Sequence, residues 1–308
     1  MSDTTGFWAD PATAGAQLGR IGVWLGGLGR VSWAEGREAA RRVEAAGYGA
    51  LWISETPGGK EPFAHAGLLL GATERIPVAT GIANIWVRDA TAARDGAAAL
   101  AEAHPGRFAL GLGVSHQPVA AMRGYDYGKP LTAMKGYLDA LDALPWNAPA
   151  PAQPVPLLLA ALRPKMLGLS AERTAGAHPY FVPVEHTEIA RATLGVGPLL
   201  APEVSIVLER DERAARERAR RFASLYLQLP NYTNNLRDLG YGDEDLEGGG
   251  SDRLIDAIVG WGDIDAVAAR VKAHLDAGAD HVCVQSVGAS VDVAVAELEA
   301  LAPALLSL

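Results

Sequence analysis

Short apolar runs alternate with amphipathic stretches along most of the chain. Between the runs, apolar residues recur every three or four positions, as at Ala40, Val43 and Ala46, which is typical of helices that bury one face. The runs themselves have the composition of strands buried on both faces. There are eight of them: Ile21–Leu25, Leu51–Glu55, Ile76–Ile82, Phe108–Leu112, Leu157–Ala160, Ala177–Phe181, Val204–Leu208 and His281–Gln285. This alternation predicts an α/β protein with a parallel sheet.

The number of strands favours one architecture over another. Eight parallel strands, nearly all followed by helices, in a chain of 308 residues fit a closed (β/α)8 TIM barrel, which usually needs ~250 residues. A doubly wound open sheet is the alternative. We expect a single domain over residues 1–308, with the barrel from about 18 to 306 and an insertion at about 226–260 between strands seven and eight. The proline-rich stretch Pro145–Pro156 is interpreted as a surface connection.

Composition and charge limit the classes of partner. Hydrophobic residues make up 49% of the chain, enough for a large core, and the net charge is −9. Binding to nucleic acid or to a membrane surface is not expected, because both depend on clustered Lys and Arg. No run approaches the ~20 apolar residues of a membrane-spanning helix. The polar segment Met1–Arg20 lacks the features of a signal peptide, so we expect a cytoplasmic protein that acts on a small molecule.

Cysteine and histidine usage speaks against metal chemistry. Cys283 is the only cysteine, which excludes an internal disulfide and a multi-cysteine metal site. The seven histidines form no tight pair on one helix face, so we expect no metal. The sequence leaves a homodimer open.

Candidate catalytic groups follow the strands, because ligands of parallel α/β folds bind at the carboxyl ends of the strands. The run Phe108–Leu112 leads into Gly113, Ser115 and His116. His116 is the main candidate for moving a proton, and its alternative is a structural histidine. Glu55 ends an otherwise apolar run and is interpreted as a site acid or as an ion-pair partner.

Other side chains near the strand ends are candidates for contacting a substrate. Trp24 and Trp86 are expected to wall an aromatic pocket, or else to fill the barrel rim. Lys129 is expected to meet an anionic group unless it is simply solvated. The stretch Gly113–Gln117 resembles half of a nucleophile elbow but lacks the final glycine, so a serine hydrolase is not favoured.

Five stretches together resemble the luciferase-like monooxygenase superfamily, in its coenzyme F420-dependent oxidoreductase branch. The resemblance runs in order from Ile21 to about Gln285. The stretches are Leu51–Glu55, Ala79–Asn84, Gly106–His116, Pro164–Leu167 and Ala277–Val282. The resemblance implies a barrel that binds a flavin or deazaflavin across its strand ends. It also implies a bulge in strand three with a non-proline cis peptide bond, for which Gly81 and Ile82 occupy the matching place.

The resemblance also implies which residues hold the cofactor, but the acid and base residues of well-known relatives have no counterparts in this chain. Many relatives place a histidine after the acid of strand two, and some place an acid after the glycines of strand four, but this chain has Thr56 and Val114 there. His116 is therefore the local substitute. The expected cofactor contacts come from successive strand ends: Ser54, Gly81, Ile82, Asn84, Gly113, Ser115, Ala160, Ala161, Gly176, Ala177 and His178.

These expectations together predict an oxidoreductase. A hydride is exchanged between coenzyme F420 and a small organic substrate, while His116 relays a proton and Glu55 shapes the polar end of the pocket. One alternative is an FMN-dependent monooxygenase that uses molecular oxygen. A second alternative, from another class, is a non-catalytic barrel that binds a flavin or another ligand.

Overall fold

The structure is a computed structural model that describes residues 6–143 and 147–308. The predicted helix end at Leu144, the first residues of the proline-rich connection and the start of Met1–Arg20 lie outside the described residues. Eleven strands are present in the described part: β1 (Ile21–Trp24), β2 (Leu51–Ile53), β3 (Val78–Thr80), β4 (Ala83–Asn84), β5 (Phe108–Gly113), β6 (Leu157–Leu159), β7 (Gly176–Ala177), β8 (Leu199–Leu200), β9 (Glu203–Leu208), β10 (Val259–Gly262) and β11 (Val282–Ser286).

All the strand pairs are parallel, and the sheet curls until its ends meet. The order of pairing is β10, β9, β11, β1, β2, β3, β5, β6, β7 and β8, with β4 paired to β5 beyond the end of β3. β8 and β9 follow one another in the chain, separated by Ala201 and Pro202. β8 pairs with β7 and β9 pairs with β11, so this single stretch closes the ring. The predicted barrel is confirmed.

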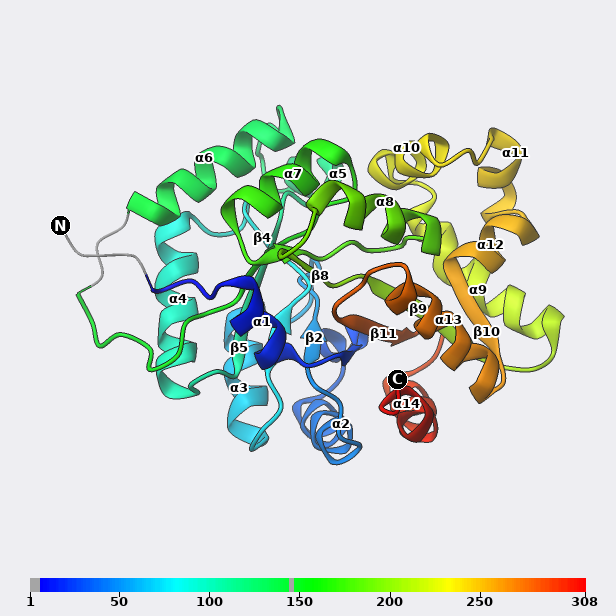
Figure 1. Ribbon diagram of the computed structural model, residues 1–308, viewed down its shortest axis with the longest axis horizontal. Helices are drawn as coiled ribbons and strands as arrows, with labels where there is room; N and C mark the ends of the chain where they lie inside the picture. The colour runs from blue at the N-terminus through cyan, green and yellow to red at the C-terminus, as the bar shows by residue number, and fades with distance from the viewer. Residues whose placement is uncertain (1–5, 144–146) are drawn as a thin grey trace.

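Helices surround the strands on all sides (Figure 1). The helices of the described part are α1 (Pro11–Leu18), η1 (Gly26–Arg30), α2 (Trp33–Ala45), α3 (Pro62–Ala72), α4 (Ala90–Ala103), α5 (Gln117–Met122), α6 (Pro130–Ala143), α7 (Pro164–Arg173), α8 (Val184–Leu194), α9 (Glu212–Tyr226), α10 (Pro230–Asp238), α11 (Asp243–Leu246), η2 (Glu247–Gly249), α12 (Asp252–Ile258), α13 (Ile264–Asp276) and α14 (Val291–Leu305). No described helix is long and apolar enough to cross a membrane.

Local sequence signals explain where several helices start and end. Ser32 begins α2 with a reciprocal capping box to Glu35, and Asp263 caps α13 by accepting from the backbone N–H of Ala266. Gly47 and Gly278 follow α2 and α13 with φ of +92° and +102°. Glycine adopts this left-handed conformation without strain, which lets the chain turn directly into the next strand.

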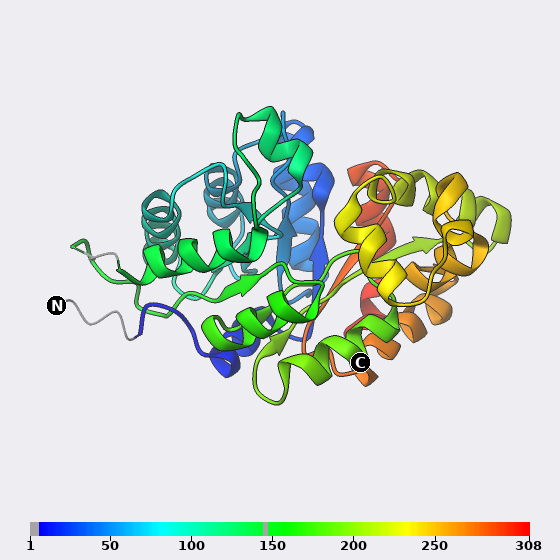
Figure 2. The same ribbon diagram turned by 90° about the horizontal axis from the view of Figure 1, so that it is seen from above.

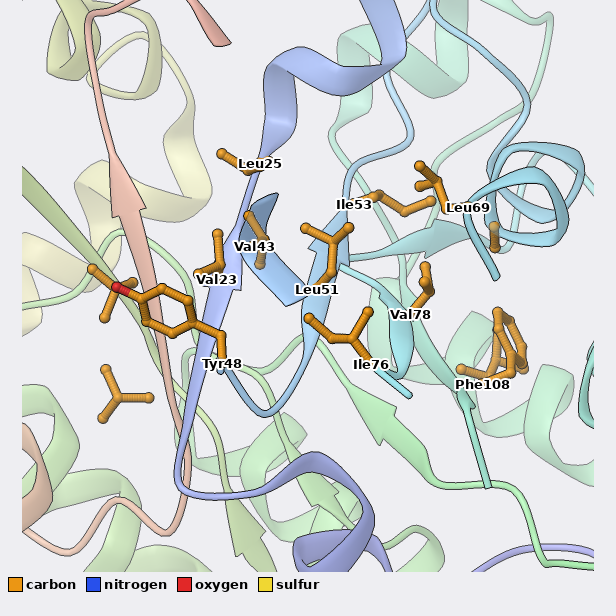
Figure 3. Close-up of a cluster of buried hydrophobic side chains, with 14 of the residues drawn as sticks. Val23, Leu25, Val43, Tyr48, Leu51, Ile53, Leu69, Ile76, Val78 and Phe108 are labelled. Carbon is orange, nitrogen blue, oxygen red and sulfur yellow. The ribbon is translucent and has the colours of Figure 1, made fainter. Parts of the chain in front are cut away.

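Alternating strand residues build two apolar layers. One set points outward and packs against the helices, as Figure 3 shows for Val23, Leu51 and Val78 beside Val43 of α2 and Leu69 of α3. The other set fills the inside of the barrel. This inner set mixes large and small side chains: Trp24, Trp52, Ala79, Ala109, Leu158, Leu199, Ala201 and Cys283. The layered interior is the usual way in which such a barrel is filled.

Two sequence expectations need correction. The sixth strand was predicted as Ala177–Phe181, whereas β7 covers only Gly176–Ala177. Pro179 has no N–H to donate, and Phe181 adopts a positive φ of 58°, so the chain leaves the sheet early. The short strand β10 was not predicted, and it pairs with β9 at the end of the insertion.

The insertion that was predicted between the seventh and eighth strands lies between β9 and β11, and it is folded rather than irregular. It contains α10, α11, η2 and α12 before β10. Figures 1 and 2 place α10 and α11, in yellow, at the end of the molecule opposite α4 and α6. The insertion has its own apolar cluster with α9, which includes Tyr232, Leu236, Leu254 and Ile255.

Candidate functional site

The third strand is interrupted where the resemblance places a bulge. β3 ends at Thr80, the peptide bond between Gly81 and Ile82 is cis, and the chain resumes pairing as β4. Thr80 bridges the break, because its hydroxyl accepts from the N–H of Gly111 and donates to the carbonyl of Gly111, at 2.9 and 2.8 Å. The bulge therefore lies at the carboxyl end of the sheet.

Glu55 anchors the segment that follows the bulge. Its carboxylate accepts both guanidinium N–H groups of Arg88 at 2.9 Å, and its Oε2 accepts the backbone N–H of Asn84 at 2.7 Å. The side chains of Glu55 and Arg88 are only 8% and 9% exposed. Asn84 in turn accepts the backbone N–H of Trp86. A bidentate ion pair thus fixes the loop that carries Trp86.

His116 stands directly before α5 and contacts the insertion. Its Nδ1 lies 2.9 Å from Oδ1 of Asn231 in α10, and its ring packs against Tyr232 with the ring centres 5.5 Å apart. Burial lowers the pKa of His116, and the hydrogen bond that Nδ1 donates to Asn231 opposes this effect. The imidazole is therefore mainly neutral at pH 7. A neutral imidazole is suited to proton transfer.

Two buried nitrogen atoms inside the barrel have no hydrogen-bond partner among the described residues: Nε1 of Trp24 and Nε2 of His178. His178 donates from Nδ1 to the carbonyl of Ala201 at 2.7 Å, so its Nε2 is a free acceptor, whereas the indole is only a donor. Burial lowers the pKa of His178 to about 4. A methyl group on Gly81 would lie 2.4 Å from Trp24 Nε1 and 3.2 Å from His178 Nε2, so both nitrogens face Gly81.

Small residues line the neighbouring strand ends. A methyl group on Gly113 would lie 2.6 Å from the side chain of Ile82 and 3.2 Å from Cβ of Ala160. Gly81, Ile82 and Ala160 are partly exposed, whereas Gly113 is buried. Three neighbouring strand ends, from β3, β5 and β6, therefore meet at this point with little side-chain bulk.

A group of contacting tyrosine rings lies next to Trp24 and His116. The hydroxyl of Tyr180 donates to Oε1 of Gln285 at 2.9 Å, so the hydroxyl of Tyr226 donates to Tyr180, at 2.8 Å. Tyr180 also packs against Trp24, and Tyr226 packs edge-on against Tyr232. Beneath them, Glu203 accepts from the hydroxyl of Ser205 at 2.6 Å.

Glu203 is a buried carboxyl group with no ion pair in the described part of the chain. Its second oxygen accepts the backbone N–H of Phe181 at 3.2 Å, and the residue is 1% exposed. Burial raises the pKa of Glu203 from 4.5 to about 7. The group therefore titrates near neutral pH inside the barrel.

The remaining predicted site residues lie in different surroundings. Trp86 donates to the carbonyl of Val114 at 2.9 Å beside Tyr125 and Tyr127, and Tyr127 donates to the carbonyl of Ser115. Ser54 donates to the carbonyl of Gly26. Lys129 is exposed.

Three predicted cofactor contacts are buried within the strand layer. Gly176 and Ala177 form β7, and Ala161 and Ala177 pack outward against Leu167 and Leu200. A cofactor role for these three residues stays a prediction.

Sequence reasoning missed several groups of this region. Asn231 lies in the predicted insertion, and its partner His116 is 115 positions away. Glu203 was left just outside the predicted seventh strand, although a lone acid next to an apolar run is a detectable signal. Tyr180 and Tyr226 carried no signal at all. Within the described residues, no three His, Cys, Asp or Glu side chains gather as metal ligands would.

The fold and the strand-end geometry define a parallel α/β barrel with its polar and small residues gathered at the carboxyl rim, where such barrels bind ligands. The sequence profile of the luciferase-like monooxygenase family matches residues 6–281. The chain belongs to this family, and the family resemblance seen in the sequence is confirmed.

Individual relatives are more distant. The 5,10-methylenetetrahydromethanopterin reductase of Methanolobus tindarius is 26% identical over 179 residues, which cover 51% of this chain and 55% of that protein. The chain thus matches only about half the length of this relative.

Two solved structures illustrate the fold. The coenzyme F420-dependent tetrahydromethanopterin reductase from Methanopyrus kandleri is 16% identical with a TM-score of 0.72, over 91% of this chain and 97% of that one. The oxygenating constituent of 3,6-diketocamphane monooxygenase from Pseudomonas putida, in complex with FMN, is 14% identical with a TM-score of 0.68, over 93% and 98%.

Proposed function

We propose that this protein is an oxidoreductase that transfers a hydride between coenzyme F420 and a small organic substrate at the carboxyl rim of the barrel. The observation that carries the proposal is the carboxyl rim itself, where the partly exposed His116 follows β5 and where Gly81, Gly113 and Ala160 form the small-residue junction. The curated relative, a reductase of a methanopterin substrate, supports redox chemistry in preference to simple ligand binding.

The residues present fit a deazaflavin or flavin ring. Such a ring carries carbonyl oxygens and an N–H on one edge, and the barrel offers an unpaired donor at Trp24 and an unpaired acceptor at His178. Leaving such groups buried and unpaired costs about 1 to 3 kcal/mol each. The bulge at Gly81–Ile82 and the strand ends at Ser115 and Ala160 are proposed to hold the ring.

The chemistry is divided between cofactor and protein. When bound, the deazaflavin supplies or accepts the hydride. His116 holds or releases the accompanying proton at Nε2. Glu55 holds Arg88 and the loop of Trp86, and so it shapes the polar end of the pocket without touching the reacting atoms. Trp86 and Lys129 are proposed to contact the substrate.

Titration with each cofactor tests the proposal. Fluorescence is followed while purified protein is added to F420 or to FMN. We expect micromolar binding of F420 and no response to FMN. In Ala160→Phe, a bulky ring next to Gly113 should abolish the binding, whereas Ala121→Phe at an exposed position should not change it. Binding of F420 that is unchanged in Ala160→Phe would contradict the proposed place of the ring.

An FMN-dependent monooxygenase is the second candidate, because a structural neighbour was solved in complex with FMN. Micromolar binding of FMN with no response to F420 would reverse the preference. Binding of either cofactor without turnover over a broad panel of alcohols, aldehydes and ketones would favour a non-catalytic barrel. In a working assay, His116→Ala should lower turnover and leave cofactor binding intact.

A further inference from the structure

We propose that Asn231, which the insertion supplies from α10, is a positioning residue that fixes the tautomer of His116 so that Nε2 is a proton acceptor. The inference rests on the proposed function, in which His116 moves the proton. It makes the insertion a part of the reaction site, although the insertion lies outside the eight-stranded barrel.

The geometry of the contact is direct. Oδ1 of Asn231 lies 2.9 Å from Nδ1 of His116, which is a normal hydrogen-bond length. A carbonyl oxygen only accepts, so the proton must be on Nδ1. A neutral imidazole carries one proton, and its Nε2 is then left with a free lone pair.

α10 is held in a way that keeps Asn231 in place. Tyr232, the next residue, packs against His116 itself and against Tyr226 and Phe181. Leu236, one turn further along, is fully buried in the same cluster. At the far end of the helix, Asp238 forms an ion pair with Arg163 next to α7. The amide is therefore carried by a helix that is held near both of its ends.

The surroundings keep the ring neutral. Burial is the main cause that lowers the pKa of His116. Its contacts in the described part of the chain are neutral groups, namely Asn231 and Tyr232 from α10. Tyr127, which reaches the neighbouring Ser115 from the loop before α6, is also neutral, because burial raises the pKa of Tyr127 to about 12 and that of Tyr232 well above 10. No charged side chain contacts the imidazole within residues 6–143 and 147–308.

A proton acceptor at Nε2 favours one direction of the proposed reaction at neutral pH. The substrate C–H bond breaks and its electron pair leaves as a hydride to the oxidised deazaflavin. The hydroxyl group on the same carbon loses its proton to Nε2 of His116, and the electron pair of the broken O–H bond forms the C=O double bond. The substrate class is thus an alcohol that becomes a carbonyl compound. Reduction of a carbonyl would need the protonated imidazole instead.

Nitrogen NMR of the histidine rings tests the inference without cofactor or substrate. In protein with ¹⁵N-labelled histidine, the His116 signals are assigned by their loss in His116→Gln. We expect Nδ1 to be protonated and Nε2 to be unprotonated at pH 7.5. A protonated Nε2 would overturn the proposal.

A pair of matched variants provides the second readout. Asn231→Asp places a carboxylate at Nδ1, and an opposite charge at this distance should raise the pKa of His116 by about 1 to 3 units. Asn234→Asp makes the same charge change on the same helix at an exposed position, and it should shift the pKa far less. Equal shifts in the two variants would mean that Asn231 makes no specific contact.

Asn231→Leu keeps the size of the side chain and removes the acceptor, so the preference for Nδ1–H should disappear while the melting temperature stays within a few degrees. If Asn231→Asp fails to fold, this variant still decides the question. Absence of F420 binding with the expected NMR result would reject the proposed function alone. Binding of F420 with a protonated Nε2 would reject the role of Asn231 alone.

Discussion

Two buried carboxyl groups on different strands of the barrel have opposite surroundings. Glu55, at the end of β2, faces the guanidinium of Arg88 and a backbone N–H. Glu203, at the start of β9, has only the hydroxyl of Ser205 and a backbone N–H. The first group is an ion-pair anchor, whereas the second titrates near neutral pH because burial raises its pKa and no cation of the described residues pairs with it. Burial alone therefore does not decide what an acid does.

The largest effect is expected when the anchor loses its cation. Arg88→Met leaves Glu55 buried without an ion-pair partner and should lower the free energy of unfolding by about 3 to 5 kcal/mol. Urea denaturation at pH 7 measures the loss. Arg75→Met is the control, because its contact with Glu74 is long and exposed, and such pairs contribute about 0 to 1 kcal/mol. Equal small losses in both variants would mean that the ion pair with Arg88 does not stabilise Glu55, and the contrast with Glu203 would disappear.

The next effect concerns pH. The pKa of Glu203 is 4.5 unfolded and about 7 folded, so between these values the folded protein retains a proton that the unfolded chain releases. The free energy of unfolding therefore falls as pH rises from 4.5 to 7, by about 3 kcal/mol from this group. Glu203→Gln should lack this fall, and it should be more stable than the wild type at pH 8 but not at pH 4.5.

Urea denaturation at pH 4.5, 6 and 8 measures the difference. Glu102→Gln, at an exposed position on α4, is the control and should keep the pH dependence of the wild type. If Glu203→Gln has the same pH dependence as the wild type, the pKa of Glu203 is not raised in the folded protein, and the charge of its carboxylate is stabilised there.

A smaller effect is expected from the tyrosine network above Glu203. Tyr180→Phe leaves Oε1 of Gln285 without a donor and the hydroxyl of Tyr226 without an acceptor. The expected loss in unfolding free energy is about 2 kcal/mol, from denaturant titration. Tyr125→Phe, with a half-exposed ring, should cost nothing measurable. A loss that is the same for both variants would show that the network is not stabilising.

The smallest effect is expected on the anchored side. Trp86→Phe removes one hydrogen bond to the carbonyl of Val114, and the rest of the loop remains held by Glu55 and Arg88. We expect a loss of about 1 kcal/mol, or about 2 °C in the melting temperature by calorimetry. A drop of more than 10 °C would mean that the indole, rather than the ion pair, holds this loop.

The sequence by itself determined the barrel. Apolar runs that are separated by helical stretches specify buried parallel strands, because a strand covered on both faces needs no polar residue. Gly47 and Gly278 specify where two of the helices end and the chain turns into the next strand. The family motifs also located the bulge at Gly81 and Ile82. The sequence did not predict the early end of β7, because apolar residues continue past Pro179. A pattern of apolar residues does not show that proline has no backbone N–H to donate to the neighbouring strand.

Only the tertiary structure decided which polar groups meet. His116 and Asn231 are separated by 115 positions, and Glu203 is unpaired because no cation within residues 6–143 and 147–308 reaches it. Such contacts depend on how loops and helices pack across the closed ring, and periodicity along one strand carries no information about them. The roles of Glu55 as an anchor and of Glu203 as a titrating group follow from those partners, not from the residue type that they share.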